Sequence, residues 1–300
     1  MFPKILCVGE SLVDVLPSGE ERCGGAPANV AFHAAILGSG DVGLVSRIGD
    51  DARGNEIRGL LQSAGVGAGC LQVDVSQPTG SVEVLPGPRY EIAAPVAWDF
   101  IEPSEENCGA AEKASVVVFG TLAQRYPVSR GTIRLLVERA RASGAVVVAD
   151  LNLRAPFIDE EVTVWTLRNC DLLKLNREEL ALVSGMLGAA GDTATLFDGL
   201  VREFGLSRAV LTCGAEGAWF FDAGRKWHQP AVAAPVVDTV GAGDAFTAVL
   251  AAALAEDVPL AQAAPAAAEV ASYVVSQPGA MPVWPEALRE RVRSILDTTA

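Results

Sequence analysis

The sequence predicts an α/β protein with a mostly parallel central sheet that is flanked by helices. Three observations lead to this class. Short apolar runs alternate with helix-like stretches along most of the chain. These runs are continuous rather than alternating with polar residues, which is typical of strands buried on both faces of a parallel sheet. A chain of 300 residues can also bury a large core, and we expect one α/β domain over residues 1–300.

Each strand of the main sheet is predicted from one apolar run, and each helix from the stretch that follows. The first strand begins almost at the N-terminus, and Pro27 sets the start of the first helix because proline is favoured in the first helical turn. The predicted strands are residues 5–8, 42–48, 116–119, 146–149, 172–175 and 209–211. The predicted helices are residues 28–37, 54–64, 129–142, 160–169 and 193–204, and from Ala242 the chain is expected to be almost wholly helical.

Residues 78–98 interrupt this alternation. Pro78, Gly80, the Pro86-Gly87-Pro88 turn and Pro95 separate two short alternating runs, residues 81–85 and 89–93, which predict a β-hairpin outside the main sheet. Together with residues 11–22, this hairpin is expected to form a small lid.

Composition and charge exclude several function classes. Acidic residues outnumber basic ones by 37 to 23, and a net charge of −14 disfavours a surface for nucleic acid. The chain has no long uncharged apolar stretch for a membrane and no signal peptide, so we expect a cytoplasmic protein. The six cysteines lie far apart and are interpreted as reduced core residues. Only His33 and His228 are present, and a structural role is favoured for His33 inside its apolar helix.

The most informative stretch is Val-Asp-Thr-Val-Gly-Ala-Gly-Asp-Ala-Phe-Thr-Ala, residues 237–248. Gly241, Ala242 and Gly243 leave room for an anion, so their backbone N–H groups and the helix that follows can bind a phosphate. Asp244 beside that phosphate is placed to take a proton from an attacking hydroxyl. The alternative is an ordinary Gly-rich loop with Asp244 as the helix N-cap.

A second group of candidates follows the first strand, where open α/β sheets place ligands. Asp14 can accept hydrogen bonds from two sugar hydroxyls, or it is an exposed turn residue. Gly24 and Gly25 let the backbone approach a ligand, and Asn29 presents an amide from the first turn of its helix.

Polar residues also follow the strands that end near residues 119 and 149. Asp150, Asn152 and Arg154 are expected near the sheet edge, where Arg154 can bind a phosphoryl group or a sugar; a surface salt bridge is the alternative. Gln124 and Arg125 occupy the equivalent position after the preceding strand and are predicted to line the sugar pocket.

Asn176 and Glu179 stand three residues apart at the start of a predicted helix, so both can face one site, although a helix cap explains the same spacing. Lys174 precedes them on the strand and can reach a phosphate.

In combination, these stretches resemble the paired signatures of the ribokinase-like carbohydrate kinases, also called the PfkB family. The resemblance covers nearly the whole chain, and its motifs occur in the family's order. They are residues 9–14 (Gly-Glu-Ser-Leu-Val-Asp), 24–31 (Gly-Gly-Ala-Pro-Ala-Asn-Val-Ala), 49–51 (Gly-Asp-Asp) with Gly54, 150–154 (Asp-Leu-Asn-Leu-Arg), 176–179 (Asn-Arg-Glu-Glu), 212–217 (Thr-Cys-Gly-Ala-Glu-Gly) and 238–244 (Asp-Thr-Val-Gly-Ala-Gly-Asp).

The resemblance implies a ribokinase-like fold, ATP and Mg²⁺, and a β-lid over the sugar site that also makes homodimer contacts. Asp14, Gly25 and Asn29 match the family's sugar-binding residues. Asn176 and Glu179 match the pair that orders Mg²⁺, its waters and the ATP phosphates, and Asp238 matches a monovalent-cation position, to which Gly279 and Ala280 add backbone, so K⁺ is implied. Three further residues, Thr212, Gly214 and Gly217, lie in the turn that family members fold around the nucleotide.

Some positions narrow the choice of substrate within the family. Ala26 stands where ribokinases usually carry Lys, which argues against ribose, and Ala268 replaces an Asn that ribokinases place near adenine. Residues 97–99 (Ala-Trp-Asp) and 122–125 (Leu-Ala-Gln-Arg) look closer to bacterial fructokinases. We therefore expect a kinase that converts fructose to fructose 6-phosphate with ATP. The alternatives are a 2-keto-3-deoxygluconate kinase or ribokinase, or a non-catalytic sugar or nucleotide sensor.

Overall fold

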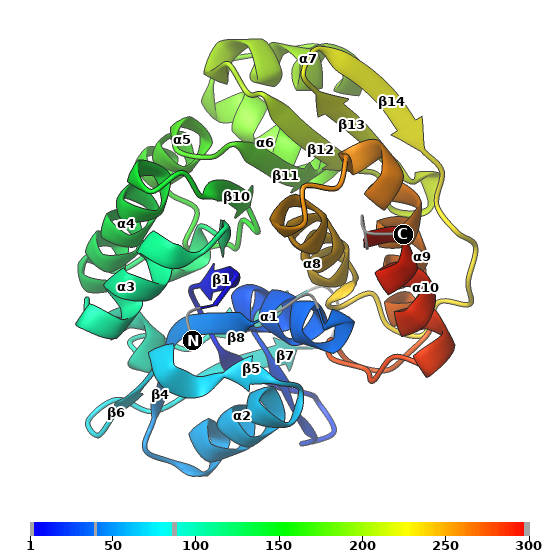
Figure 1. Ribbon diagram of the computed structural model, residues 1–300. Coiled ribbons are helices and arrows are strands. Elements are labelled where there is room, and N and C mark those ends of the chain that lie inside the picture. The colour runs from blue at the N-terminus through cyan, green and yellow to red at the C-terminus, as the bar shows by residue number, and fades with distance from the viewer. Residues whose placement is uncertain (1–2, 39–40, 86–88, 297–300) are drawn as a thin grey trace.

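The computed structural model describes residues 3–38, 41–85 and 89–296, and its centre is one large twisted sheet (Figure 1). Within these residues the sheet has ten strands in the order β14-β13-β12-β11-β10-β9-β1-β4-β5, with β6 paired to β4. In chain order the strands are β1 (Ile5–Val8), β4 (Val42–Gly49), β5 (Val66–Gly67), β6 (Leu71–Asp74), β9 (Val116–Phe119), β10 (Val146–Asp150), β11 (Leu172–Asn176), β12 (Arg208–Thr212), β13 (Ala218–Asp222) and β14 (Arg225–Gln229).

The N-terminal strand lies in the middle of this sheet. Ile5 of β1 is opposite Val42 of β4 on one side and Val116 of β9 on the other, and both pairings are parallel. Only β13 and β14, at one edge, run antiparallel to their neighbours. The mostly parallel sheet predicted from the apolar runs is therefore confirmed, and so are its six predicted strands.

Helices cover both faces because successive strand residues point to opposite sides. Ile5 and Cys7 pack in one core, whereas Leu6 and Val8 pack in the other. The first core lies under α1 (Ala26–Leu37), α2 (Ala52–Ser63), α8 (Ala242–Ala255), α9 (Leu260–Val275) and α10 (Glu286–Leu296). The second lies under α3 (Glu105–Lys113), α4 (Pro127–Ala142), α5 (Glu160–Arg168), α6 (Arg177–Met186) and α7 (Thr193–Phe204).

A separate sheet of four strands has the order β3-β2-β7-β8. Its strands are β2 (Leu12–Val15), β3 (Glu21–Gly24), β7 (Gly80–Leu85) and β8 (Arg89–Ile92), and β7 and β8 form an antiparallel hairpin. These strands overlap the two segments that were expected to form a lid, and we call them the small sheet. The Pro86-Gly87-Pro88 turn between β7 and β8 lies outside the described residues.

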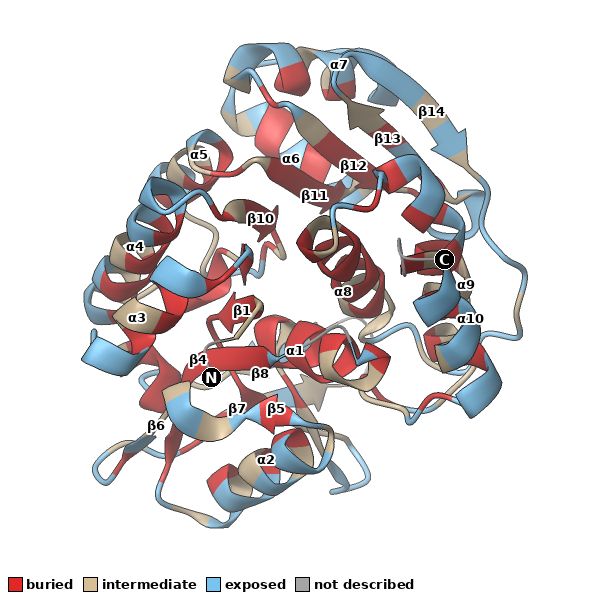
Figure 2. Cartoon of the chain, viewed as in Figure 1, coloured by how far each residue is buried: buried red, intermediate tan, exposed pale blue. Residues whose placement is uncertain are grey.

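The segment from Ala242 onward folds as α8, α9 and α10, with an irregular stretch between α9 and α10. Alanine lets α8 and α9 approach closely, and α8 is buried around nearly its whole circumference (Figure 2). This packing holds the first turn of α8 in the centre of the molecule. No helix in the described part of the chain has the length and apolar character needed to cross a bilayer.

Candidate active site

Most of the predicted residues meet where the carboxyl ends of the central strands face the first turns of α1 and α8. The side-chain amide of Asn29 on α1 lies 2.6 Å from Oδ2 of Asp244 on α8. Lys174, near the end of β11, reaches the same turn, because a Cβ added to Gly243 would lie 2.8 Å from its Nζ. Sugar-side and phosphate-side candidates therefore share one site.

The turn before α8 has the backbone that an anion site needs. Gly241 is the N-cap of α8, with φ 80° and ψ −11°, and no side chain caps the helix. A Cβ at Gly241 would lie 2.6 Å from the Cα and carbonyl oxygen of Ala280, so a larger residue would displace the turn. The N–H groups of residues 241–243 and the positive end of α8 are left for a ligand. We call residues 241–243 the anion turn.

Asp244 lies in the first turn of α8 rather than at its N-cap, so the alternative of an ordinary capping aspartate is wrong. Its carboxylate is directed across the site to Asn29. Burial raises the pKa of Asp244 to about 6, Asp150 adds to the rise, and Lys174 and the Asn29 hydrogen bond oppose it. A carboxylate with this pKa is mostly ionised at neutral pH, and it is a stronger base than an ordinary aspartate.

A buried ion pair between Lys174 and Asp150 lies next to the anion turn. Nζ of Lys174 lies 3.1 and 3.0 Å from the two carboxylate oxygens of Asp150. The Thr247 hydroxyl lies 2.8 Å from Oδ2 of Asp150 and 3.0 Å from the Gly243 carbonyl, which connects the pair to α8. Burial opposes the lysine charge, but nearby carboxylates, Asp150 first, outweigh it and raise the pKa of Lys174. A permanent positive charge therefore lies beside the anion turn.

On the sugar side, Asp14 projects from β2 of the small sheet. A Cβ added to Gly24 would lie 2.8 Å from Oδ2 of Asp14, and one added to Gly25, whose φ is +103°, would lie 2.6 Å from the Glu10 carbonyl. Both glycines are therefore required by close contacts. Burial raises the pKa of Asp14 to about 6, and the charge of Arg154 opposes this rise.

Arg154 is exposed on the loop that follows β10. Its positive charge opposes the rise in the pKa of Glu10, Asp14 and Asp244, so Arg154 lies near these three carboxyl groups. Within the described ranges no hydrogen bond or ion pair joins its guanidinium to another residue, so the alternative of a surface salt bridge has no partner there. Its guanidinium is available for an anionic group of a ligand.

Gln124 and Arg125 do not line the pocket, and this prediction is wrong. The Gln124 side chain is fully buried, and its amide donates to the Gly120 carbonyl at 2.9 Å and lies 3.1 Å from the Thr166 hydroxyl. Arg125 is buried in a bidentate ion pair with Asp99, with both N–O distances 2.7 Å. The short turn after β9 directs both side chains inward, so they hold the interior together.

Asn176 and Glu179 form a helix cap. The Asn176 side chain accepts from the Glu179 N–H at 2.8 Å, and Glu179 accepts from the Asn176 N–H at 2.8 Å and the Leu153 N–H at 3.0 Å. Both oxygens of Glu179 thus already have donors, and the described residues contain no cluster of three or more His, Cys, Asp or Glu that could hold a metal. This donor set fits a hydrated Mg²⁺ that rests on ligand phosphates and reaches Glu179 through water.

Asp238 precedes the anion turn, and its carboxylate is occupied. It accepts from the Val240 N–H at 3.0 Å and the Gly279 N–H at 3.1 Å, and the Arg22 guanidinium of the small sheet lies 3.4 Å away. A cation bound by this side chain would have to compete with Arg22.

A pocket of about 880 Å³ lies beside the anion turn, between the ends of β11 and β12 and helices α8 and α9. Predicted nucleotide residues Asn176, Thr212, Gly214 and Gly217 line one end of it. Gly217 has φ +91°, and a Cβ there would lie 2.1 Å from the Gln229 carbonyl. The other end is mostly apolar and includes Ala268, Ala271 and Val275, which suits an aromatic base.

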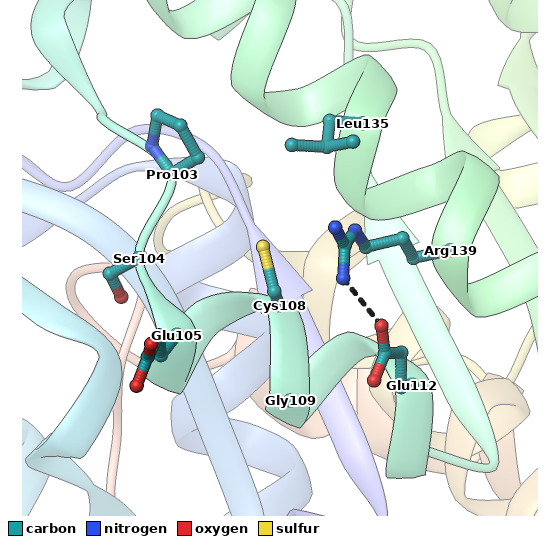
Figure 3. A pocket seen from close by; sticks show the side chains of 8 residues that line it. All are labelled: Pro103, Ser104, Glu105, Cys108, Gly109, Glu112, Leu135 and Arg139. Atoms are coloured by element: carbon teal, nitrogen blue, oxygen red, sulfur yellow. Dashed lines mark hydrogen bonds and ion pairs between the residues drawn. The ribbon is translucent and has the colours of Figure 1, made fainter.

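A second hollow of about 570 Å³ lies between α3 and α4 (Figure 3). Glu112 and Arg139 form an ion pair across it at 2.6 Å, and Cys108 points into it. None of the predicted site residues lines this hollow, and we assign no catalytic or binding role to the residues that line it.

Sequence reasoning placed Asp150 near the sheet edge but missed its ion pair with Lys174, and it missed two further neighbours of the site, Glu10 and Thr247. Glu10 lies in a recognised motif, yet its buried carboxyl next to the site went unnoticed; burial raises its pKa to about 7, and its Oε2 has no hydrogen-bond partner among the described residues. Thr247 could have been found from its position one turn after Gly243 on the same helix face.

Taken together, the fold and the arrangement of a buried carboxylate beside an anion turn are typical of a phosphotransferase. Comparisons agree with this class, because residues 4–287 match the family described as pfkB family carbohydrate kinase. The chain belongs to this family and is a sugar kinase.

Two curated relatives are similar over most of the chain. A fructokinase from Klebsiella pneumoniae is 34% identical over 272 residues, which cover 85% of this chain and 85% of that protein. An aminoimidazole riboside kinase from Salmonella typhimurium is 28% identical over 257 residues, 81% of this chain and 78% of that protein. The crystal structure of aminoimidazole riboside kinase from Salmonella enterica, complexed with aminoimidazole riboside and an ATP analog, superposes with a TM-score of 0.83 at 26% identity, covering 98% of this chain and 99% of that chain. The ribokinase-like fold expected from the sequence is confirmed.

Proposed function

We propose that this sugar kinase is an ATP-dependent, Mg²⁺-requiring fructokinase that converts fructose to fructose 6-phosphate. The observation that carries the proposal is the position of Asp244, which has the anion turn before it and the sugar-side amide of Asn29 2.6 Å from its carboxylate. The similarity to a fructokinase at 34% identity supports the choice of sugar.

Each residue has a defined task in this proposal. Asp14 and Asn29 hold sugar hydroxyls, with Gly25 allowing the sugar to approach the backbone. Asp244 accepts the proton of the primary hydroxyl as that oxygen attacks the terminal phosphorus, and the bond from this phosphorus to the bridging oxygen breaks, so that ADP leaves. The N–H groups of Gly241, Ala242 and Gly243, with the charge of Lys174, stabilise the transferring phosphoryl group.

The nucleotide occupies the pocket lined by Asn176, Thr212, Gly214 and Gly217, with its base towards Ala268. Glu179 would hold Mg²⁺ through water, and the ion would supply neutralisation of the charge on the phosphates. K⁺ near Asp238 is a further part of the proposal, although Arg22 occupies the carboxylate in this structure.

Arg154 favours a second candidate. Its guanidinium has no partner among the described residues and can bind the carboxylate of a sugar acid, which points to 2-keto-3-deoxygluconate. Ribose and aminoimidazole riboside are further substrates to test, the latter because of the nucleoside kinase that the chain resembles. A non-catalytic sensor is disfavoured, because such a protein has no need of a carboxylate with the position and pKa of Asp244.

The deciding experiment is a coupled ADP-release assay with ATP and Mg²⁺ across these substrates and adenosine. We expect the highest kcat/KM with fructose. A clear preference for another substrate refutes fructokinase, and ATP binding without any turnover supports a sensor.

We also propose that the small sheet acts as the lid over the sugar and contributes to a homodimer, because β3 and β8 are its edge strands and pair with no further strand in the described part of the chain. Light scattering after gel filtration measures the mass directly, and a monomer at assay concentration would refute the dimer.

A further inference from the structure

His33 lies at the centre of α1 with none of its surface exposed. Its Nε2 lies 2.8 Å from the carbonyl oxygen of Ala280, and its Nδ1 lies 3.1 Å from the indole Nε1 of Trp284. Trp284 is buried as well, so α1 and the distant segment of residues 280–284 meet at one imidazole.

These partners determine the tautomer of His33. An indole N–H can only donate, so Nδ1 must be the acceptor, and the remaining proton must be on Nε2. Nε2 therefore donates to Ala280. Burial lowers the pKa of His33 to about 4, so the ring stays neutral and this arrangement holds at neutral pH.

The carbonyl that His33 holds belongs to the segment against which the anion turn rests. A Cβ placed on Gly241 would lie 2.6 Å from both the Cα and the oxygen of Ala280, so these two residues are in close backbone contact. The neighbouring Gly279 N–H donates to Asp238 at 3.1 Å. His33 and Asp238 thus fix residues 279–280 behind the anion turn from two sides.

The same helix also holds the base. Asn29 is four residues before His33, so the two side chains leave α1 on one face, one turn apart. Asn29 contacts Asp244, and His33 contacts the backbone behind Gly241. One rigid helix therefore sets the position of the base relative to the phosphate-binding N–H groups.

We propose that His33 is a positioning residue for phosphoryl transfer, which acts by holding the Ala280 carbonyl against Gly241 and so keeps the anion turn in register with Asp244. The proposal rests on the phosphate-binding role of residues 241–243 in the proposed function. Phosphoryl transfer is sensitive to sub-ångström placement, so a small shift of the turn lowers the rate although no group that touches a substrate is changed.

The test compares variants of the full-length protein. His33→Leu removes the donor and leaves Ala280 and Trp284 with unpaired buried groups, whereas His33→Gln keeps an N–H donor near the position of Nε2. Trp284→Phe removes only the proton donor to Nδ1. The control is Leu37→Ala, a buried change in the last turn of α1 that removes no hydrogen-bonding group.

We expect His33→Leu to lower kcat at least tenfold and to weaken binding of ADP, with the sugar KM within about twofold of wild type. His33→Gln should recover most of the lost rate, and Trp284→Phe should fall between them. Leu37→Ala should lower Tm by about as much as His33→Leu does, and it should leave kcat nearly unchanged. If His33→Leu does not fold, His33→Gln and Trp284→Phe carry the same comparison.

Rates and ADP affinities of the His33 variants equal to those of Leu37→Ala would overturn the proposal. A loss confined to the sugar KM would do the same. ADP affinity, measured by calorimetry, keeps this test separate from the proposed function: a wild type that phosphorylates no sugar refutes the kinase assignment, while the ADP comparison still decides the role of His33.

Discussion

The amide of Asn29 donates to Oδ2 of Asp244 over 2.6 Å, although 215 positions separate the two residues in the chain. One oxygen of the base is thereby engaged, and Oδ1 is the atom left to accept a proton from the substrate. The hydrogen bond also opposes the rise in the pKa of Asp244. In the proposed function, Asn29 therefore orients the base as well as contributing to the sugar site.

Asp244→Asn should lower kcat by about 10²- to 10⁴-fold, because an amide keeps the shape of the side chain but cannot take a proton. Nucleotide binding should remain near that of wild type, measured by calorimetry with ADP. Asp257→Asn, an exposed change beyond the end of α8, is the matched control and should leave both quantities unchanged. Near-wild-type turnover in Asp244→Asn would remove this residue from its role.

The same carboxylate should set the acid limb of the pH profile. Asp244 must be ionised to act as base, so kcat/KM should fall as the pH drops through about 6, the raised pKa of the free protein. Asp14 has a similar pKa, so the profile of Asp14→Asn separates the two. If kcat/KM of Asp14→Asn no longer falls at acid pH, the group that titrates in the profile is Asp14 and not Asp244.

Asp244 should also make stability depend on pH. Its folded pKa is raised from 3.8 to about 6, so its stabilising contribution is complete below 3.8 and is lost as the pH rises through about 6. Asp244→Asn should therefore be more stable than wild type at pH 7.5, by at most about 3 kcal/mol, with the difference shrinking towards pH 4. Urea unfolding at both pH values measures it, and equal stability at pH 7.5 would contradict the buried, charged state.

Gly243→Val should weaken phosphate-dependent steps rather than sugar affinity. Its Cβ would lie 2.8 Å from Nζ of Lys174 and would occupy the space of the anion. Gly199→Val on α7, where an added Cβ meets nothing within 4 Å, is the control for the general cost of the substitution. Loss of sugar binding with normal nucleotide binding would show that the anion turn is wrongly assigned.

Asp14→Ala should raise the KM for fructose strongly and change the KM for ATP little. A sugar hydroxyl that loses its buried acceptor costs about 1 to 3 kcal/mol, which is roughly a five- to 150-fold change. Initial rates with each substrate varied in turn provide the measurement. An unchanged sugar KM would exclude Asp14 from the pocket.

Gln124→Met should lower stability and leave the sugar KM unchanged. The substitution keeps the volume but leaves the Gly120 carbonyl and the Thr166 hydroxyl without their buried donor, at a cost of about 1 to 3 kcal/mol each. Arg154→Met is the complementary variant, because this exposed side chain should affect KM and not Tm. A raised sugar KM in Gln124→Met would restore the original sequence prediction.

Six strands of the main sheet could be predicted because they are buried on both faces, which leaves short continuous apolar runs between helix-like stretches. Helix α3 was missed because Glu105–Lys113 is mostly polar and contains a glycine, although Ser104 before two glutamates is an N-terminal signal. The edge hairpin β13–β14 was missed too. Its alternating Trp219, Phe221 and Trp227 are the signal that could have revealed it.

The site was predictable where a local motif fixes the backbone. Gly241–Asp244 and Asn176–Glu179 each form their geometry within a few residues. The direction of Gln124 depends instead on how the turn after β9 packs against α5, and the contact of His33 with Ala280 spans 247 positions. Such contacts form only in the assembled core, so no local pattern in a single sequence predicts them.

The distance along the chain between Asn29 and Asp244 also has a consequence for synthesis. A ribosome adds about 5 to 20 residues per second, so the base emerges roughly 10 to 40 seconds after the amide that orients it. During that interval β1 and α1 can take their places, but the nascent chain has neither a base nor a phosphate cradle. In the proposed function, an unfinished chain therefore cannot transfer a phosphoryl group until residues 241–244 have left the ribosome.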